Sequence, residues 1–432
     1  MYVITIAVGI IQMILIGYIL YTEVNKKSPA VFLWATLFLM FGLPHMVVSF
    51  TLDNDYPMEV LAKASVFVIL FCLTYIAVRR RKECSFVHLS NHGFALKESE
   101  VQGSQFELVC TALLIASLIA YMASYALSQG GILNTTWAGG RAVASSYVSL
   151  SGLLTRLIFT FSGTTLYCLL TKRRGMALLI VLIFVLMVIL TRNRVQAIPV
   201  LVLPIAIVLI RIKKIQPKHI IIGAVLAFGA IYIVYALRAF RWMGTLSEAI
   251  GNFSFAALNS RILYFLEDQS GELGLRRVFY FFIDNNNQFE GFNRGHTYIR
   301  MLLVYLPSRL TFGLKPESFD LTMGRAIGMA SGGSYHPTLF GDCFGNLGWM
   351  GVFLGAFWSL FCNLVDRIIE RQPDDYFRIM IFFLATYAFV VIGRGSVYNG
   401  FQVLAWGVLI LLIFRILLYR LIKTKIGTAY YQ

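Results

Sequence analysis

The sequence predicts an all-α polytopic membrane protein with about eleven membrane-spanning helices. Hydrophobic residues make up 58% of the 432 positions and charged residues only 13%, which leaves too little polar surface for a water-soluble fold. Apolar runs of roughly 20 residues recur without polar alternation, which favours spanning helices over barrel strands. The cations gather in short clusters between these runs, as they do in loops that orient a membrane protein.

The apolar runs give the spans in chain order. The first run lacks a basic leading segment, so we expect a retained span rather than a cleaved signal. A long polar segment separates two groups of spans and divides the chain into residues 1–237, 238–345 and 346–432. The predicted spans are residues 2–21, 29–51, 58–78, 107–127, 148–171, 175–191, 195–211, 218–237, 346–366, 375–392 and 400–420.

Clusters of lysine and arginine in alternate loops set the predicted orientation. By the positive-inside rule the side that carries them is the cytoplasm. The N-terminus is then outside, the C-terminus inside, and residues 238–345 are extracytoplasmic. Because these cations are topology signals, the net charge of +16 does not predict a nucleic-acid partner. The clusters are Lys26/Lys27 and residues 79–82, 172–174, 211–214, 367–371 and 423–425.

The extracytoplasmic segment 238–345 contains nine arginines and a single lysine, Lys315. Nine carboxylates nearly cancel their charge, and such a mixed polar surface suits a sugar substrate. The apolar stretches of the segment are too short to span, which predicts interfacial helices that lie along the outer membrane surface and cover a cleft open to lipid and water. These stretches read SFAALNSRILYFL, LRRVFYFFI and YIRMLLVYLP.

Four arginines outside this segment break the charge rule. Arg192 and Arg194 occupy a tight exterior turn, Arg394 occupies a second one, and Arg156 lies about two turns inside a span. Arginine makes bidentate contacts to phosphate, and the turns precede spans whose N-termini face outside, where free N–H groups and the helix dipole favour an anion. The pattern predicts a pyrophosphate site, although a single arginine could instead snorkel to lipid phosphates.

Three strings resemble Wzy-type oligosaccharide repeat-unit polymerases. SYHPTLFGDCFGNLGWMGVFLGAF (334–357) resembles the segment that leads from their long exterior loop, and that of O-antigen ligases, into the next helix. GHTYIRMLLVYLPSRLTFGLKP (295–316) resembles the Pro-Arg-Lys-Pro stretch of the polymerases, and TRNRVQAIP resembles their exterior arginine turn. The matching positions are His336, Asp342, Gly348 and Gly351 in the first string and Pro307, Arg309, Lys315 and Pro316 in the second.

The resemblance implies a GT-C-like, processive glycosyltransferase in a bacterial inner (plasma) membrane, with its active site facing the periplasm. It would transfer a growing O-antigen or capsule glycan from polyprenyl pyrophosphate to the terminal sugar of a new lipid-linked repeat unit. The expected substrate is an undecaprenyl-pyrophosphate-linked oligosaccharide, with membrane lipid, a chain-length regulator and a flippase as partners. We expect no cofactor and no metal, because arginines can neutralise a departing pyrophosphate and no carboxylates have metal-ligand spacing.

His336 is the leading candidate for the base that takes the acceptor proton, since the pKa of a free histidine lies near neutral pH. Asp342 is the alternative base and His296 a weaker candidate. Arg309 joins Arg192, Arg194, Arg394 and Arg156 as an expected pyrophosphate ligand. The competing interpretations are that His336 caps the next helix, that Asp342 interacts with the helix dipole, and that Arg309 forms ion pairs within the loop.

Two other functions stay open at this point. An O-antigen ligase would move the finished glycan to a lipid acceptor, although the Lys315–Pro316 stretch favours a polymerase. A transporter or flippase of lipid-linked oligosaccharide would be expected to show paired repeats with broken helices. The sequence has no internal repeat, and its ionisable groups gather at the exterior edge, which disfavours a transporter.

Overall fold

The computed structural model is all-helical over the residues that it describes. It describes the chain apart from residues 51–54, 81–99, 137–149, 172, 193–202, 211–224, 226–228, 230–231, 233–234, 238, 241–243, 253, 268–273, 288, 307, 327–334, 373 and 430–432. Within the described part, nine helices are long and apolar enough to cross a membrane. The predicted class, an all-α polytopic membrane protein, is therefore confirmed at this level.

The nine helices agree with nine of the predicted spans, and the other two, 195–211 and 218–237, fall largely outside the described residues. Hydropathy identifies spans well because a helix in lipid must be apolar along its whole length. The nine are Tyr2–Lys26, Ala30–Phe50, Met58–Val78, Phe106–Ser128, Gly152–Leu170, Arg174–Thr191, Thr338–Glu370, Asp375–Gly393 and Val397–Leu417.

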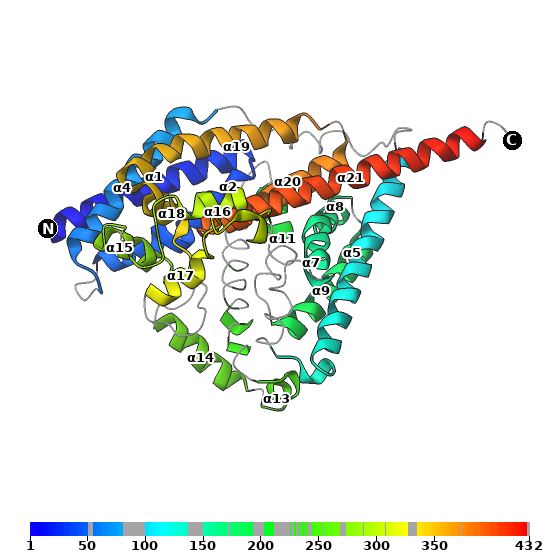
Figure 1. Ribbon diagram of the computed structural model, residues 1–432, viewed down its shortest axis with the longest axis horizontal. Helices are drawn as coiled ribbons and strands as arrows, with labels where there is room; N and C mark the ends of the chain where they lie inside the picture. Colours follow the sequence, from blue (N-terminus) through cyan, green and yellow to red (C-terminus); the bar gives the residue numbers. More distant parts are fainter. Residues whose placement is uncertain are drawn as a thin grey trace. The chain divides into compact units, whose positions relative to one another are not determined.

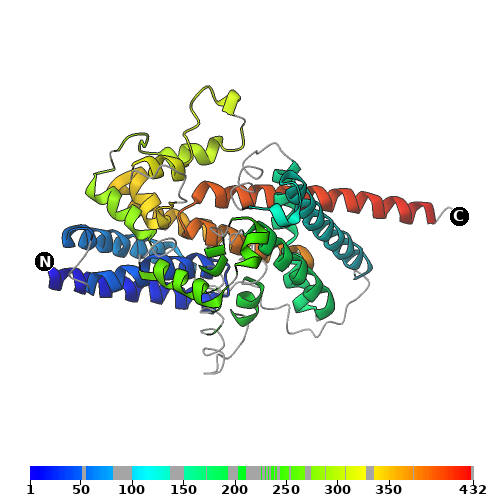
Figure 2. The ribbon, with the colours of Figure 1, turned by 90° about the horizontal axis from the view of Figure 1, so that it is seen from below.

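The chain forms two compact units (Figures 1 and 2). Unit 1 consists of residues 1–85, 269–371 and 385–404, and unit 2 of residues 86–268, 372–384 and 405–432. Helices α20 (Asp375–Gly393) and α21 (Val397–Ala429) contribute to both. Unit 1 also holds α1 Tyr2–Lys26, α2 Ala30–Leu37, η1 Phe38–Gly42, α3 Leu43–Phe50, α4 Met58–Val78, α15 Arg276–Asp284, α16 His296–Leu303, η5 Ser308–Thr311, α17 Phe319–Ala326, α18 Thr338–Leu347, η6 Gly348–Phe353 and α19 Leu354–Glu370.

Unit 2 is built around α5, which packs against α7 and α9. Here Gly163 allows a close approach, since a Cβ atom on it would lie 2.9 Å from the Met380 sulfur. Its other elements are shorter, and α11, α13 and α14 follow α9. The elements of unit 2 are α5 Glu100–Ser128, η3 Ile132–Asn134, α7 Leu150–Phe161, α8 Gly163–Leu170, α9 Arg174–Thr191, α11 Leu203–Ile210, α13 Leu246–Gly251 and α14 Phe255–Glu267.

The second span contains one π-helical turn, η1, between α2 and α3. It precedes Pro44, which has no N–H group and whose ring would collide with a carbonyl in the preceding turn of a regular α-helix. The N–H of Leu43 bonds instead to the Phe38 carbonyl, one residue further back than in an α-helix. The proline thus accounts for the local widening of the helix.

A buried network of ions around Arg79 joins the ends of α1, α4 and α19. The Arg79 guanidinium donates to both carboxylate oxygens of Glu23, at 2.8 and 2.6 Å, and pairs with Asp366 at 2.7 Å. Ser28, which precedes α2, donates to Asp366 at 2.7 Å, so the start of α2 belongs to the same network. Burial opposes the charge of Arg79, but the carboxylates outweigh it and raise the pKa of the guanidinium, so the arginine is charged.

This network adds a function to Arg79 that the sequence did not reveal. Arg79 belongs to a cluster predicted to be a topology signal, yet its side chain is only 3% exposed. Asn363 accepts a hydrogen bond from Arg79 at 2.6 Å, and Tyr75 donates to Glu23 at 3.2 Å. The ends of three helices that were predicted to lie on one side do therefore meet, as Figure 1 shows for α1, α4 and α19 running together.

Helix α18 runs in the opposite direction to α19, although both lie in one candidate span. Along α4, Phe340 faces Phe71 and Phe344 faces Phe67, so α18 is antiparallel to α4. Further on, the Thr74 hydroxyl donates to the Val352 carbonyl at 2.8 Å, and Asn363 meets Arg79, so α19 is parallel to α4. The chain turns back in η6, where Gly351 packs so closely that a Cβ atom would overlap the Cys343 carbonyl oxygen.

Helix α18 lies where the prediction has the end of the exterior loop. Residues 338–345 were expected in the exterior loop, and Asp342 in a short turn, but these residues form α18 and are buried in unit 1. The prediction also placed LRRVFYFFI on the membrane surface, whereas α15 packs between α4 and α18. The hydroxyl of its buried Tyr280 lies 2.5 Å from Nδ1 of His45. Apolar residues on several faces of α15 explain its burial within the protein.

We predict that Arg79→Met greatly destabilises the protein. The substitution keeps an unbranched side chain but leaves Glu23 and Asp366 buried without their cation, which should cost about 3–5 kcal/mol. The matched control is Lys63→Met on the same helix, because Lys63 pairs with Glu59 at an exposed site. Thermal unfolding in detergent should show a large drop for Arg79→Met only, and equal melting temperatures in the two variants would contradict the assigned role.

Candidate functional site

The candidate site lies in unit 1, where the start of α18 meets the turn between α20 and α21. The Thr338 N–H donates to the Arg394 carbonyl at 3.2 Å. The approach requires glycine at position 395, which has a φ of 95° and where a Cβ atom would lie 2.5 Å from the Thr338 nitrogen. His336 and Arg394, predicted from separate parts of the sequence, are thus brought to neighbouring backbone segments, and His336 is buried.

Two helices begin at this junction, α18 at Thr338 and α21 at Val397. The first N–H groups of a helix have no partner within it, and the dipole gives that end a partial positive charge. Arg394 lies in the turn that leads into α21. The junction therefore brings the Arg394 backbone beside the starts of two helices, where N–H groups that have no partner favour an anion.

Thr338 is held in a conformation that β-branched residues rarely adopt. Its φ is 58°, in the left-handed region, and its side chain is fully buried. Within the described residues its hydroxyl has no hydrogen-bond partner. Such strain costs of order 1 kcal/mol or more, and it is concentrated at functional sites.

Asp342 lies one helical turn after Thr338 and is 1% exposed. Neither of its carboxylate oxygens accepts a hydrogen bond of good geometry from the described residues. Tyr298 lies close to it. Burial and the nearby Cys343 and Asp342 raise the pKa of the Tyr298 hydroxyl well above its ordinary value. Burying a carboxyl group in this way costs free energy, and groups that are kept at such a cost often have a function. Asp342 is therefore included in the candidate site.

Side-chain hydrogen bonds of Asn346 attach α16 to α18. Its amide accepts from the Thr297 N–H at 3.1 Å and donates to the Thr297 hydroxyl at 2.6 Å. It also donates to the Asp342 carbonyl at 2.7 Å. These bonds fix Tyr298 beside Asp342. Sequence reasoning missed Asn346 and Tyr298 because neither is one of the matching positions within the strings 334–357 and 295–316.

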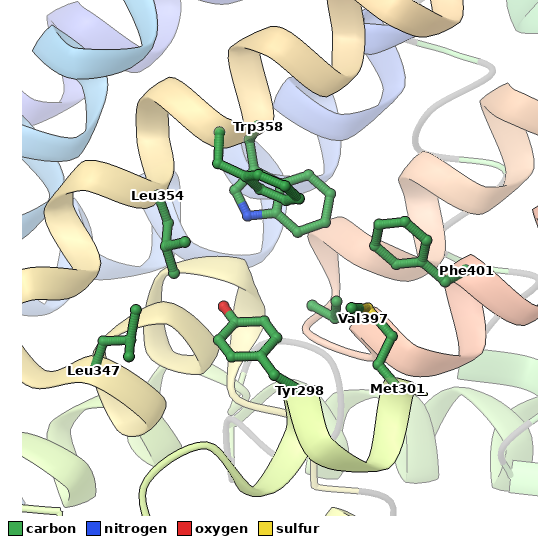
Figure 3. A pocket seen from close by; sticks show the side chains of 8 residues that line it. Tyr298, Met301, Leu347, Leu354, Trp358, Val397 and Phe401 are labelled. Carbon is green, nitrogen blue, oxygen red and sulfur yellow. The ribbon is translucent and has the colours of Figure 1, made fainter. Parts of the chain in front are cut away.

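An apolar cavity of about 210 Å³ adjoins the junction. Figure 3 shows Trp358 and Tyr298 on opposite sides of it. Val397, the first residue of α21, lines it and lies three positions after Arg394. The lining residues are Tyr298, Met301, Leu347, Leu354, Phe357, Trp358, Val397 and Phe401.

The cavity borders the exposed apolar face of α19. Its lining residue Phe357 is 45% exposed, and Phe353, Leu360 and Leu364 extend the same exposed face along the helix. In a spanning helix an exposed apolar face contacts lipid. The cavity thus suits a hydrocarbon chain that arrives from the bilayer.

Arg300 is a second arginine near α21 that sequence reasoning did not select. Its guanidinium lies 5.1 Å from the centre of the Tyr398 ring and donates to the Pro316 carbonyl at 2.5 Å. The side chain is buried, so its charge is desolvated beside the first turn of α21. The sequence feature that could have identified Arg300 is its position four residues after His296 in an amphipathic stretch.

The structure gives Arg192 a structural role. Its guanidinium donates to three backbone carbonyls of unit 2, those of Phe240, Gly244 and Thr135, at 3.1, 2.6 and 3.1 Å. Burial lowers the pKa of Arg192 below its ordinary value. The guanidinium therefore binds the main chain through these three carbonyls.

The other predicted pyrophosphate ligands are scattered. The Arg156 guanidinium in unit 2 lies 4.6 Å from the centre of the Trp406 ring, a cation–π contact that explains a charge inside a span. Arg309 is exposed in η5, and Arg194 lies outside the described residues. Of the four arginines that the structure describes, only Arg394 lies at the junction with His336.

His296 serves as a structural residue. Burial, with a smaller contribution from Arg300, lowers its pKa to about 4, so the ring is neutral at pH 7. Its Nε2 lies 2.8 Å from the Glu317 carbonyl and must therefore carry the proton that it donates. This bond attaches α16 to the segment before α17 and leaves His336 and Asp342 as the candidate bases.

No protein-family model, no curated protein and no solved structure matches the chain. The described residues contain no group of three or more His, Cys, Asp or Glu side chains that could hold a metal ion.

We predict that glycine is better tolerated than alanine at position 338. Thr338→Gly removes the Cβ atom that the left-handed conformation disfavours, so it should be more stable than Thr338→Ala by about 1 kcal/mol. At Ser359, in the middle of α19, the order should be reversed, with glycine less stable by about 0.5–1 kcal/mol. Thermal unfolding of the four variants tests this, and the same order at both positions would refute the strained conformation.

We predict that the contribution of His296 to stability falls as the pH drops from 6.5 to 4. Over this range the unfolded chain protonates His296 and the folded chain does not, because the folded pKa is about 4. The unfolding free energy should therefore decrease on acidification by at most about 1.4 kcal/mol per pH unit from this group. His296→Gln retains a donor for the Glu317 carbonyl and should reduce the slope. An unchanged slope in unfolding midpoints would exclude His296 as the titrating group.

Proposed function

We propose that the protein is a membrane-embedded glycosyltransferase that polymerises lipid-linked oligosaccharide repeat units on the extracytoplasmic face. The observation that carries this proposal is one junction in unit 1 where the turn that contains Arg394 leads into the first turn of α21, which also lines an apolar cavity. A polyprenyl pyrophosphate has the two matching parts, a doubly charged head group and a hydrocarbon chain. The resemblance of residues 295–316 and 334–357 to repeat-unit polymerases supports the same function.

In this proposal Arg394 and the starts of α18 and α21 hold the pyrophosphate of the donor. Its negative charge increases as the bond to the sugar breaks, and preorganised donors at a buried position stabilise that charge without rearranging. The cavity beside Val397 holds the first part of the polyprenyl chain. Arg156 and Arg192 are left out because both lie in unit 2, whereas the junction lies in unit 1.

The bond changes require one base. The acceptor hydroxyl attacks the anomeric carbon of the growing glycan, the bond from that carbon to the pyrophosphate oxygen breaks, and the oxygen keeps the electron pair. The proton of the hydroxyl passes to His336 or to Asp342, which lie at the start and in the first turns of α18. A single displacement of this kind inverts the configuration at the anomeric carbon.

Two alternatives share the same site. A ligase would make one transfer to a lipid acceptor, with the same leaving group. A transporter of lipid-linked oligosaccharide is favoured by one observation, since α18 reverses direction within a candidate span, as broken helices do in transporters. A transporter would move the lipid without forming a glycosidic bond.

The polymerase proposal predicts a ladder of longer glycans from purified protein in nanodiscs that is supplied only with a lipid-linked repeat unit. Arg394→Lys keeps the charge but loses the planar fork, so turnover should fall about tenfold to a hundredfold. The matched control is Arg277→Lys, a partly exposed arginine elsewhere in unit 1 that pairs with Asp55. It should retain wild-type turnover.

Other outcomes identify the alternatives. One transfer to an added lipid acceptor, with no ladder, would indicate a ligase. Movement of the lipid between leaflets without any new bond would indicate a transporter. His336→Ala and Asp342→Asn separate the two candidate bases, and the loss should be about a hundredfold for the residue that takes the proton. Wild-type rates in Arg394→Lys would refute the proposed anion site.

A further inference from the structure

A projection of unit 1 exposes apolar side chains to an unusual degree. We call residues 302–306 and 308–314, which run from the end of α16 through η5, the apolar finger. In Figure 2 this yellow-green segment stands off the neighbouring helices of its unit. Phe312 is 90% exposed, which is the largest exposure of any large hydrophobic side chain among the described residues. The other exposed members are Leu302, Tyr305, Leu306, Leu310 and Leu314.

Hydrogen bonds from two cations fix the base of the finger. Lys315 donates to the Leu306 carbonyl at 3.0 Å, and Arg300 donates to the Pro316 carbonyl at 2.5 Å. At the tip, Phe312 has a φ of 48° and Gly313 a φ of 79°, so the chain turns there through left-handed conformations. A bulky residue in this region is unusual, and it presents the Phe312 ring at the turn rather than burying it.

The charge around the finger has one sign. Residues 291–316 contain Arg294, Arg300, Arg309 and Lys315 but no aspartate or glutamate. Arg294 and Arg309 are exposed. The extracytoplasmic segment as a whole is nearly balanced, so this concentration of cations is local.

The finger and its surroundings combine exposed apolar side chains with the exposed arginines Arg294 and Arg309. One partner matches both features, the surface of a bilayer that contains anionic lipid. Apolar side chains enter the hydrocarbon while arginine and lysine bind head-group phosphates. A neutral apolar partner would match the tip but would leave the cations without a counterpart. The chain is already held in a bilayer by its spanning helices, so the lipid surface is within reach of any projecting segment.

We propose that the apolar finger inserts Phe312 and its neighbours into the acyl region of the adjacent leaflet, with Arg294 and Arg309 bound to anionic head groups. This anchoring does not depend on the proposed enzymatic function. It would attach the segment between α16 and α17 to the membrane directly, in addition to its contacts within unit 1.

The test uses the full-length protein in nanodiscs of phosphatidylcholine, with or without phosphatidylglycerol. Phe312→Trp places a fluorophore at the tip, and the wild-type protein, with its six tryptophans, supplies the background to be subtracted. Lipids brominated on their acyl chains should quench the added tryptophan, and aqueous iodide should not. The matched control is Glu290→Trp, at an exposed polar position outside the finger, where iodide should quench and brominated lipid should not.

Phosphatidylglycerol should increase the quenching of the Phe312→Trp variant by brominated lipid at least twofold, and Arg309→Ser in the same background should reduce that increase. Quenching of the added tip fluorophore by iodide alone would overturn the proposal. Protection from both quenchers would also overturn it, because the tip would then be covered by protein. Leu310→Trp repeats the measurement at a second exposed position if Phe312→Trp does not fold.

Discussion

The buried ions around Arg79 constrain the rest of unit 1. A guanidinium that is 3% exposed must keep its two carboxylates close, and these come from α1 and α19 while the arginine follows α4. Breaking any one contact would leave a desolvated charge, so the three helix ends are held at a common level. The register of α4 against α19 depends on this network.

That register positions the candidate site. With α19 fixed against α4 at Asn363 and Val352, the glycine-dependent turn in η6 sends α18 back along α4 in the opposite direction. The start of α18 then meets the turn at Arg394, where two helix N-termini and one arginine are combined. The cavity beside Val397 follows from the same arrangement, because α16, α19 and α21 meet there without filling the space between them.

The spans could be predicted from the sequence, and the functions of individual polar residues only in part. Hydropathy is a local property of a helix, so most of the nine spans were located to within a few residues. The direction of α18 depends on how Gly351 packs on Cys343, which no local pattern records. Arg192 and Arg394 occupy similar exterior turns, yet one is bound to three carbonyls and the other lies at the junction with His336. Asp342 was predicted as a candidate, but its burial in a helix was not.

The reversal at α18 has a consequence for the order of assembly. Helix α18 has 10 residues and is too short to cross a bilayer by itself. We therefore do not expect it to be inserted as a span of its own. Its start contacts the turn at Arg394, which the ribosome produces later than α18 itself. The junction can therefore close only after the chain has been synthesised past Arg394, so the site forms later than the helix that begins it.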